Sequence, residues 1–218
     1  MPELRHEDHV FVLDLGDGEN RFAPDWVKTV DALLDTVVEH PEPAVLVTTG
    51  RGKFYSNGLD LDWLAEHADE FGPYVADVEA LLARVLTLPV PTIAAVNGHA
   101  FGAGAMFAIA HDFRIMRADR GYFCFPEVDI RIPFSPGMAA LVQGKTTPAA
   151  AVASMTTGRR FGGVEARVIG LVDDTAEEAA LVAAASTRVR PLAGKDRATL
   201  GAIKSTMYAT AVTALTTR

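Results

Sequence analysis

Two glycine-rich turns hold the residue types in this sequence that are best suited to chemistry. The first is residues 54–60 (FYSNGLD), and the second is residues 97–106 (NGHAFGAGAM). Each turn follows an apolar run and leads into a stretch with helical character. The first amides of a helix lack acceptors within the helix, and the helix dipole adds partial positive charge there. Two such amides that point at one carbonyl oxygen would form an oxyanion hole.

The spacing of the glycines excludes two common phosphate-binding loops. A dinucleotide fingerprint requires G-x-G-x-x-G, whereas Gly98, Gly102 and Gly104 follow G-x-x-x-G-x-G. Residues 50–53 (GRGK) lack the spacing of a Walker A loop and its Ser or Thr after the lysine. Small residues that only allow close helix packing are the alternative for either turn by itself. The presence of two such turns favours a role in binding.

An ordered series of motifs extends this pattern along the chain. They are F-x-x-x-G-x-D-L at 54–61, N-G-x-x-x-G-x-G at 97–104, D-x-R-I at 112–115, F-x-x-P-E-V at 123–128 and G-R-R-F-x-x-x-E-A-x-x-x-G-L-V-D at 158–173. Over residues 10–173 the series resembles the crotonase, or enoyl-CoA hydratase/isomerase, superfamily. The resemblance implies an α/β fold, a crotonase-like spiral of strand-strand-helix turns with a C-terminal helical region. It also implies acyl-CoA thioester substrates and trimeric assembly through the C-terminal helices.

The resemblance assigns catalytic roles to three positions. The two oxyanion amides fall on Leu59 and Ala103, and the catalytic acid matches Glu127. Hydratases of this family use two glutamates, and the first of them would fall on Met106, which cannot exchange a proton. One carboxylate suffices to move a proton from the α carbon to the γ carbon of an enoyl thioester. The pattern therefore resembles the isomerases that convert 3-enoyl-CoA to 2-enoyl-CoA.

Glu127 stands among apolar residues, with Phe125 before it and Val128 and Ile130 after it. Burial among such residues would raise the pKa of a carboxyl group and make it a stronger base. Without the resemblance, a solvated turn residue is the simpler interpretation. Asp129 is an alternative base if the segment is extended, because alternate residues of a strand share a face.

Binding of the substrate is assigned to residues of the two turns, to nearby cations and to apolar side chains of an acyl pocket. These candidates are Arg21, Lys53, Asn57, Gly58, Gly102, Met106 and Phe134. Arg21 and Lys53 are suited to pair with CoA phosphates, although a surface cation often serves solubility alone. Met106 and Phe134 have ordinary core packing as their alternative. We expect no metal and no redox cofactor, with coenzyme A present only as part of the substrate.

The elements that must position these residues alternate between strand and helix in the first part of the chain. Apolar runs predict strands at 10–15, 44–49, 92–96, 113–116 and 122–125, and helical periodicity predicts helices at 24–40, 60–67 and 74–88. A further helix follows the second turn. Beyond residue 136 the pattern predicts only helices, at 136–143, 148–157, 162–169, 176–189 and 196–214. We expect one domain over 1–218, with an α/β spiral core at 1–135 and a helical oligomerisation region at 136–218.

Composition limits the partners and the compartment. The 218 residues include 20 Lys and Arg against 28 Asp and Glu, a formal charge of -8, which disfavours nucleic acid as a partner. The N-terminus is too polar for a secretory signal, and no apolar run approaches the ~20 residues of a membrane helix. The single cysteine, Cys124, favours a reducing compartment and is expected to be buried, with a reactive thiol as the alternative.

The sequence therefore predicts a cytoplasmic homotrimer or dimer of trimers that isomerises 3-enoyl-CoA, with no membrane and no nucleic-acid partner. Two other functions stay open. One is a different crotonase reaction, such as enoyl-CoA hydration or acyl-CoA thioester hydrolysis, with Glu127 or Asp129 activating water. The other is an acyl-CoA-binding protein without turnover.

Overall fold

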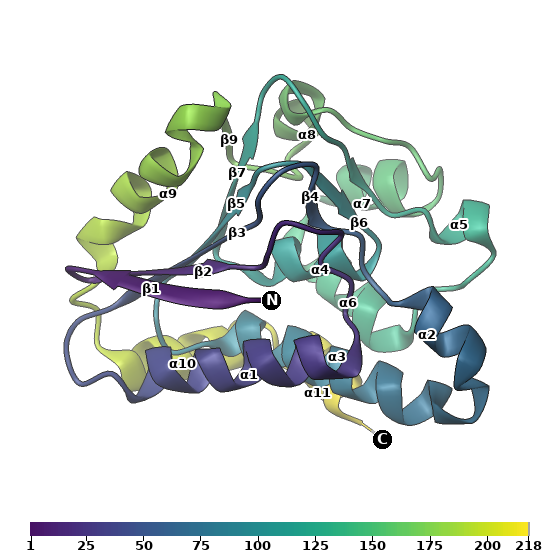
Figure 1. Cartoon of the computed structure of the whole chain (residues 1–218), viewed down its shortest axis with the longest axis horizontal. Coiled ribbons are helices and arrows are strands. Elements are labelled where there is room, and N and C mark those ends of the chain that lie inside the picture. The colour runs from purple at the N-terminus through teal and green to yellow at the C-terminus, as the bar shows by residue number, and fades with distance from the viewer. Residues whose placement is uncertain (218) are drawn as a thin grey trace.

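A computed structural model describes residues 1–217 and contains one large and one small β-sheet. The large sheet has the strand order β1-β2-β3-β5-β7-β9 (Figure 1). Its strands are β1 (Glu3–Glu7), β2 (Val10–Asp14), β3 (Val45–Thr49), β5 (Thr92–Val96), β7 (Phe113–Arg117) and β9 (Asp174–Ala176). β1 pairs with β2 in antiparallel fashion, and every other neighbouring pair is parallel.

The small sheet lies beside the large one and completes each turn of a spiral. It consists of β4 (Phe54–Ser56), β6 (His99–Phe101) and β8 (Phe123–Cys124), which are parallel. A strand of the large sheet is followed by one of the small sheet and then by a helix: β3-β4-α2, β5-β6-α4 and β7-β8-α5. The three helices are α2 (Leu61–Glu66), α4 (Ala103–Ala110) and α5 (Glu127–Ile130). The three helices therefore start from the same small sheet, as the predicted strand-strand-helix spiral requires.

Both faces of the large sheet are covered. On one face α1 (Pro24–Glu39) and α3 (Phe71–Thr87) pack with α4 over the main apolar core. On the opposite face α9 (Leu181–Val189) packs against Val45, Val47 and Ile93 of the central strands (Figure 1). All residues of β3 and β5 are buried, which explains why these strands are continuous apolar runs in the sequence.

The C-terminal part is not entirely helical, so that prediction is wrong at one point. It contains α6 (Pro136–Lys145), α7 (Pro148–Met155), α8 (Gly163–Ile169), α9, α10 (Arg197–Met207) and α11 (Ala209–Thr216), with the 3-10 turns η2 (Glu178–Ala180) and η3 (Arg190–Leu192). Before α9 the chain adds β9 to the edge of the large sheet, where Asp174 pairs with Ile115. A three-residue edge strand leaves no periodic signal, because its pairing with β7 decides its conformation.

Two helix boundaries in this part also differ from the prediction. The predicted helix 176–189 begins only at Leu181, after β9 and the turn η2. The predicted helix 196–214 is interrupted at Tyr208, which separates α10 from α11. Ala211 and Leu215 of α11 belong to the same core as α3 and α6, so the C-terminal helices pack onto the spiral. The predicted domain extends to Arg218, which lies outside the described residues.

Three further strands were not predicted, each for a local reason. β1 has four exposed residues out of five, so it lacks an apolar pattern. β4 and β6 have three residues each and lie inside the glycine-rich turns.

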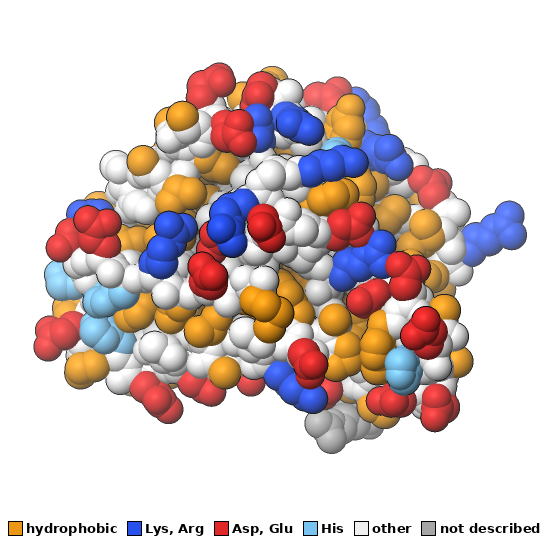
Figure 2. Space-filling view, in the orientation of Figure 1, with side chains coloured by type: hydrophobic (Ala, Val, Ile, Leu, Met, Phe, Trp, Pro, Cys, Tyr) orange, Lys and Arg blue, Asp and Glu red, His pale blue; other side chains and the backbone are white. Residues whose placement is uncertain are grey.

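On the face shown in Figure 2, acidic and basic side chains are interspersed over the surface. No helix within residues 1–217 is long and apolar enough to span a membrane.

Candidate active site

A cavity of about 370 Å³ brings the two glycine-rich turns together with Glu127. Its walls come from the loop after β2, from both turns, from α5 and from the segment before α6. The lining residues that the sequence predicted are Arg21, Asn57, Leu59, Gly102, Ala103, Met106, Glu127 and Phe134. Gly58 and Lys53 are the two predicted site residues that do not line this cavity. Asp129 does not line it either.

The two turns touch each other directly, and this contact explains why Gly58 is glycine. Gly58 has φ +81°, and a Cβ built on it would lie 2.7 Å from the Phe101 carbonyl oxygen and 3.0 Å from the Ala103 amide nitrogen. No side chain fits at that approach. Gly58 therefore lets the Leu59 turn approach the Ala103 amide.

Neither candidate oxyanion amide has a partner within residues 1–217. The Leu59 and Ala103 N–H groups donate no hydrogen bond to a protein acceptor there, whereas the neighbouring Gly102 amide donates to the Cys124 carbonyl at 3.1 Å. Ala103 is the first residue of α4, so its amide has no acceptor within the helix. Both amides are available to a ligand oxygen in the cavity.

Glu127 opens α5 and is 8% exposed. Its Oε2 has no hydrogen-bond partner within the described chain. A Cβ built on Gly102 would lie 3.5 Å from Glu127 Oε1, so the carboxyl group lies beside the second turn. Burial raises the pKa of Glu127 to about 7. A buried polar atom without a partner is rare, and here it belongs to a carboxyl group that faces a cavity.

The segment around Glu127 is helical, so the condition attached to Asp129 as an alternative base is not met. Asp129 lies in the short helix α5, and its side chain is exposed. Its carboxyl group lies against Gly158, where a built Cβ would be 2.3 Å from Asp129 Oδ2. In a helix, residues two apart point in different directions. Of the two carboxylates on α5, only Glu127 lines the cavity for this reason.

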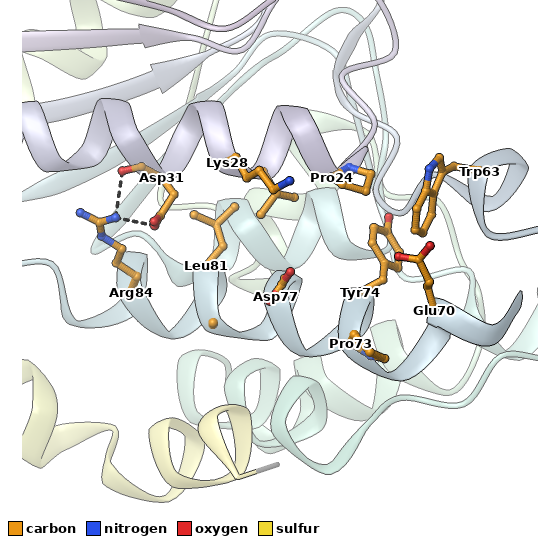
Figure 3. A pocket seen from close by; sticks show the side chains of 12 residues that line it. Pro24, Lys28, Asp31, Trp63, Glu70, Pro73, Tyr74, Asp77, Leu81 and Arg84 are labelled. Atoms are coloured by element: carbon orange, nitrogen blue, oxygen red, sulfur yellow. Dashed lines mark hydrogen bonds and ion pairs between the residues drawn. The ribbon is translucent and has the colours of Figure 1, made fainter. Parts of the chain in front are cut away.

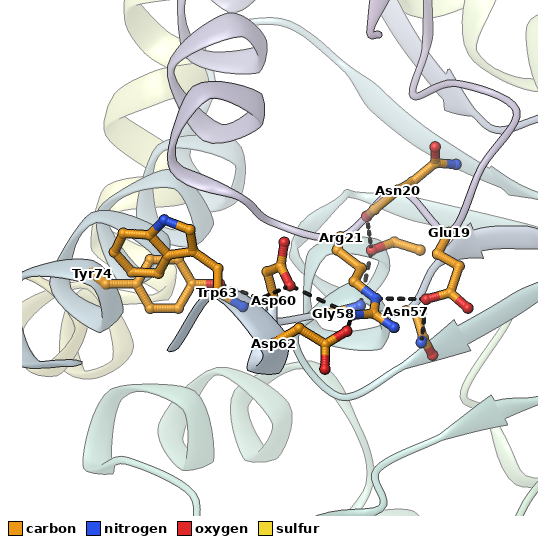
Figure 4. Close-up of polar contacts among 10 residues, drawn as sticks. Glu19, Asn20, Arg21, Asn57, Gly58, Asp60, Asp62, Trp63 and Tyr74 are labelled. Atoms are coloured by element: carbon orange, nitrogen blue, oxygen red, sulfur yellow. Dashed lines mark hydrogen bonds and ion pairs between the residues drawn. The ribbon is translucent and has the colours of Figure 1, made fainter. Parts of the chain in front are cut away.

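Arg21 reaches the cavity but is surrounded by carboxylates (Figure 4). Its Nε donates to Glu19 Oε2 at 2.5 Å, and its Nη1 contacts Asp60 at 3.4 Å and also pairs with Asp62. The hydrogen bonds that Arg21 donates to Asp62 and to Glu19 raise its pKa above the usual range. Asp60 also caps α2 by accepting from the Trp63 amide at 3.3 Å. Arg21 thus ties the start of α2 to the loop after β2.

Two other cations near the turns, Lys53 and Arg160, differ in whether they line the cavity. Lys53 is exposed and lies over the Phe54 ring, 5.1 Å from its centroid. Arg160 lines the cavity and lies 5.6 Å from the centroid of Phe101. Within residues 1–217 Arg160 has no carboxylate at ion-pair distance. The sequence analysis did not identify Arg160 as a site residue, although Arg160 belongs to the G-R-R-F motif. The local sequence at 158–161 does not indicate which turn the Arg160 side chain faces.

Apolar side chains form much of the remaining cavity wall. Met106 is 1% exposed, and Phe134 packs edge-on against Phe125 with ring centroids 5.9 Å apart. Sequence reasoning missed further apolar members of this wall, namely Ile130, Ile132, Pro133 and Met138. The only other carboxylate among the described lining residues is Asp62, which is exposed and paired with Arg21.

His99 and Cys124 lie outside the cavity lining. His99 is on β6 among the rings of Phe54, Phe101 and Tyr122, and burial lowers its pKa. Cys124 is buried, as expected, and its Sγ donates to the Gly158 carbonyl at 3.3 Å. Burial raises the pKa of this thiol to about 11, which disfavours the reactive thiolate.

A second cavity, of about 470 Å³, lies between α1 and α3 (Figure 3). Its acidic members are Asp31, Glu70 and Asp77, and at one end Arg84 pairs with Asp31 and Asp35. Clustered carboxylates repel an anionic ligand such as an acyl-CoA. Neither glycine-rich turn reaches this cavity, so we assign the chemistry to the cavity that contains Glu127.

Comparison with known proteins identifies the class that this fold and site define. The chain matches the family model described as enoyl-CoA hydratase/isomerase over residues 6–218. The chain belongs to this family, as predicted.

Curated relatives and solved structures agree with that assignment. Enoyl-CoA delta isomerase 3 of Arabidopsis thaliana is 40% identical over 187 residues, which are 83% of this chain and 79% of the relative. The carnitinyl-CoA dehydratase of Escherichia coli K12 is 37% identical over 76% of this chain and 64% of that protein.

Among solved structures, an enoyl-CoA hydratase/isomerase family protein from Pseudomonas syringae superposes with a TM-score of 0.91 at 25% identity, covering 98% of this chain and 94% of that one. A probable enoyl-CoA hydratase from Mycobacterium tuberculosis gives a TM-score of 0.90 at 24% identity and covers 98% of this chain and 91% of that one. These superpositions confirm the predicted crotonase-like fold.

Proposed function

We propose that this chain is an enoyl-CoA delta isomerase that converts 3-enoyl-CoA to 2-enoyl-CoA thioesters with Glu127 as its single base. The observation that carries the proposal is a buried carboxyl group, of which Oε2 has no hydrogen-bond partner among residues 1–217, in the same cavity as two backbone amides that donate to no acceptor in that range. Three curated relatives of 37–40% identity are enoyl-CoA delta isomerases, which supports the same reaction.

The proposed reaction requires one proton acceptor that also returns the proton. The Glu127 carboxylate removes a proton from the α carbon, between the thioester carbonyl and the double bond, and becomes a carboxylic acid. The electrons of that C–H bond form a dienolate, and the acid then protonates the γ carbon. The double bond moves to the α,β position, and the carboxylate is restored. Because burial raises the pKa of Glu127 to about 7, each of its two forms is accessible near neutral pH.

The negative charge of the dienolate develops on the thioester oxygen. The Leu59 and Ala103 amides are proposed to donate to that oxygen. Such donors stabilise the transition state because they are oriented before charge develops, and each is worth about 3–4 kcal/mol in well-studied enzymes. Gly58 supports this arrangement, because the absence of a side chain lets its turn approach the Ala103 amide nitrogen, which would lie 3.0 Å from a built Cβ.

The identity of residue 106 favours isomerisation over hydration. Addition of water to a double bond needs one group that activates water and a second that delivers a proton. Met106 supplies neither group, and Asp62 is paired with Arg21.

We propose that Arg160 is the cavity cation that binds an anionic part of the CoA, because Arg21 is already surrounded by carboxylates.

An assay with purified protein tests the reaction. We expect 3-hexenoyl-CoA to give the absorbance of the conjugated 2-enoyl thioester, and Glu127→Gln to lower the rate by about 10²–10⁴-fold, the usual contribution of a general base. Glu127→Gln must fold like the wild type by circular dichroism. Formation of 3-hydroxyacyl-CoA from 2-hexenoyl-CoA would instead support a hydratase. Tight binding with no turnover would support an acyl-CoA-binding protein.

A second experiment tests the backbone amide of Ala103. Proline is tolerated at the first position of a helix, and α1, α6 and α7 of this chain already begin with Pro24, Pro136 and Pro148. Ala103→Pro removes the N–H group, and we expect kcat to fall about 10²–10³-fold. Ala103→Ser keeps the amide and is the matched control. Equal kcat for the two variants would contradict the proposed oxyanion hole.

We also propose that the chain forms a homotrimer or a dimer of trimers through its C-terminal region, residues 136–218. Exposed valines support this: Val152 on α7 is 62% exposed, and Val164 and Val168 on α8 are 58% and 79% exposed. Large apolar side chains that are exposed together often mark protein interfaces. Light scattering coupled to gel filtration should give the mass of three or six chains, and a monomer at micromolar concentration would contradict the proposal.

A further inference from the structure

A pocket of about 350 Å³ lies between α10, the end of α6 and the starts of β5 and β7. It shares no lining residue with the cavity that contains Glu127. Its charged and polar members are Asp112, Lys145, Lys195, Lys204 and Tyr208. The proposed isomerase reaction uses none of these residues.

Lys204 is fully satisfied within the protein. Its Nζ donates to the Leu88 and Val90 carbonyl oxygens, both at 2.9 Å, and to Asp112 Oδ2 at 2.6 Å. An ammonium group has three donors, so these contacts use all of them. Lys204 and Asp112 therefore form a structural pair, and neither needs a ligand.

Lys145, in the same pocket, contrasts with Lys204. Its Nζ donates to the Tyr208 hydroxyl at 3.2 Å and lies 4.9 Å from the centroid of that ring. Within residues 1–217 it has no carboxylate at ion-pair distance. Burial, and after it the nearby Arg114 charge, lower the pKa of Lys145 to about 8. A half-buried ammonium with one donor engaged and no carboxylate within ion-pair distance among the described residues favours an anionic partner.

The other lining residues indicate the kind of anion. Lys195 is exposed at the same pocket, so three lysines face one carboxylate. The remaining wall is largely aliphatic and includes Leu192, Leu200, Ile203 and Met207, of which the last two are 49% and 65% exposed. An inorganic anion would satisfy the lysines but would leave this aliphatic surface in water. An anion with an aliphatic chain covers both.

We propose that this pocket binds a small aliphatic carboxylate, whose oxygens accept hydrogen bonds from Lys145 Nζ and the Tyr208 hydroxyl. The Tyr208 oxygen already accepts from Lys145, so its hydrogen is free to donate to the carboxylate. Burial raises the pKa of Tyr208, which keeps that hydrogen in place at neutral pH. The chain of the ligand would lie along the Leu200, Ile203 and Met207 side chains of α10.

Calorimetric titration with octanoate tests the proposal on the full chain. We expect saturable binding to the wild type and an affinity at least about tenfold lower for Lys145→Gln, because a charge-assisted hydrogen bond is lost. Lys28→Gln removes an exposed lysine from α1 and is the matched control, expected to bind like the wild type. Octanol and inorganic phosphate, which lack the charge and the chain respectively, should each bind more weakly than octanoate.

Protection of Lys145 locates the ligand without a variant. Octanoate should slow the reaction of Lys145 with an amine reagent, measured by peptide mass spectrometry, while Lys28 reacts at an unchanged rate. If Lys145→Gln misfolds, this protection decides the question in the wild type. Equal octanoate affinity of folded Lys145→Gln and wild type, displacement of octanoate by 2-hexenoyl-CoA, or absence of protection would each overturn the proposal. Phosphate binding as tight as that of octanoate would also do so.

Discussion

Glu127 and Lys204 are both buried ionisable side chains, and they differ in how their polar atoms are satisfied. Lys204 is 3% exposed and engages two carbonyl oxygens and the Asp112 carboxylate. Glu127 is 8% exposed, yet its Oε2 has no partner among residues 1–217. Lys204 joins α10 to the loop between α3 and β5, whereas Glu127 faces a cavity.

This difference separates a group that stabilises the fold from one that is available for chemistry. Asp112 also accepts from the Thr92 amide at 2.8 Å, so the Lys204 contacts form part of a connected network. Glu127 lies in an apolar setting that raises its pKa. A strained or unsatisfied group at a functional site lowers stability, and the rest of the protein compensates for that cost.

The largest expected effect is the loss of stability on removing Lys204. Lys204→Met should lower the free energy of unfolding by about 3–5 kcal/mol, because the half-buried Asp112 carboxylate loses its ion-pair partner and two carbonyl groups lose their donor. Urea denaturation followed by circular dichroism measures the change. The double variant Lys204→Met, Asp112→Asn should lose less than the sum of the two single variants, since both act on one pair. A loss equal to that sum would show that the pair is not coupled.

Removal of the Glu127 charge should have the opposite effect on stability. The folded pKa of about 7 lies above the ordinary value of 4.5, so the folded state resists ionisation more than the unfolded chain does. The resulting penalty is absent below pH 4.5, grows as the pH rises and is complete above pH 7. Glu127→Gln should therefore be more stable than the wild type by about 1–3 kcal/mol at pH 8.

The same unfolding measurement at pH 4 provides the control for Glu127→Gln. There both states of the wild type carry a protonated carboxyl group, and the advantage of the variant should vanish. An advantage of the same size at pH 4 and pH 8 would mean that packing, and not ionisation, causes it.

The smallest expected effect is the slope of activity with pH. The isomerase reaction begins with the carboxylate form of Glu127, so kcat/KM should rise about tenfold per pH unit below pH 7 and level off above it. Initial rates with 3-hexenoyl-CoA between pH 5 and pH 9 give this profile. A plateau extending down to pH 5 would contradict the raised pKa of the base.

Much of the site could be predicted because its motifs are local. The turn around Gly58 and the helix start at Ala103 each depend on a few neighbouring residues, and the family resemblance carried by these motifs predicted the Leu59 and Ala103 amides, which the structure brings to one cavity. The apolar neighbours of Glu127 together with the resemblance likewise predicted its burial. Asp129 could not be judged from sequence, because four residues of α5 are too few to show a period.

The roles of the cations could not be predicted in the same way. Arg21 is suited to a phosphate by residue type alone, but the fold places Asp60 and Asp62 beside it. Arg160 lies far along the chain from Phe101, and only the pairing of β6 with β8 and of Phe123 with Phe161 brings them together. Long-range contacts of this kind leave no local pattern.

The sequence alone determined the family, through its ordered motifs, and the glycines at the two turns, because backbone sterics act over a few residues. Tertiary structure decided which polar atoms find partners. It placed Arg21 among carboxylates and satisfied Lys204. Over the described residues it left Lys145 with one hydrogen-bond partner and the Glu127 Oε2 with none. The reason is physical, since a hydrogen bond depends on distances of about 3 Å between groups that can be any number of residues apart.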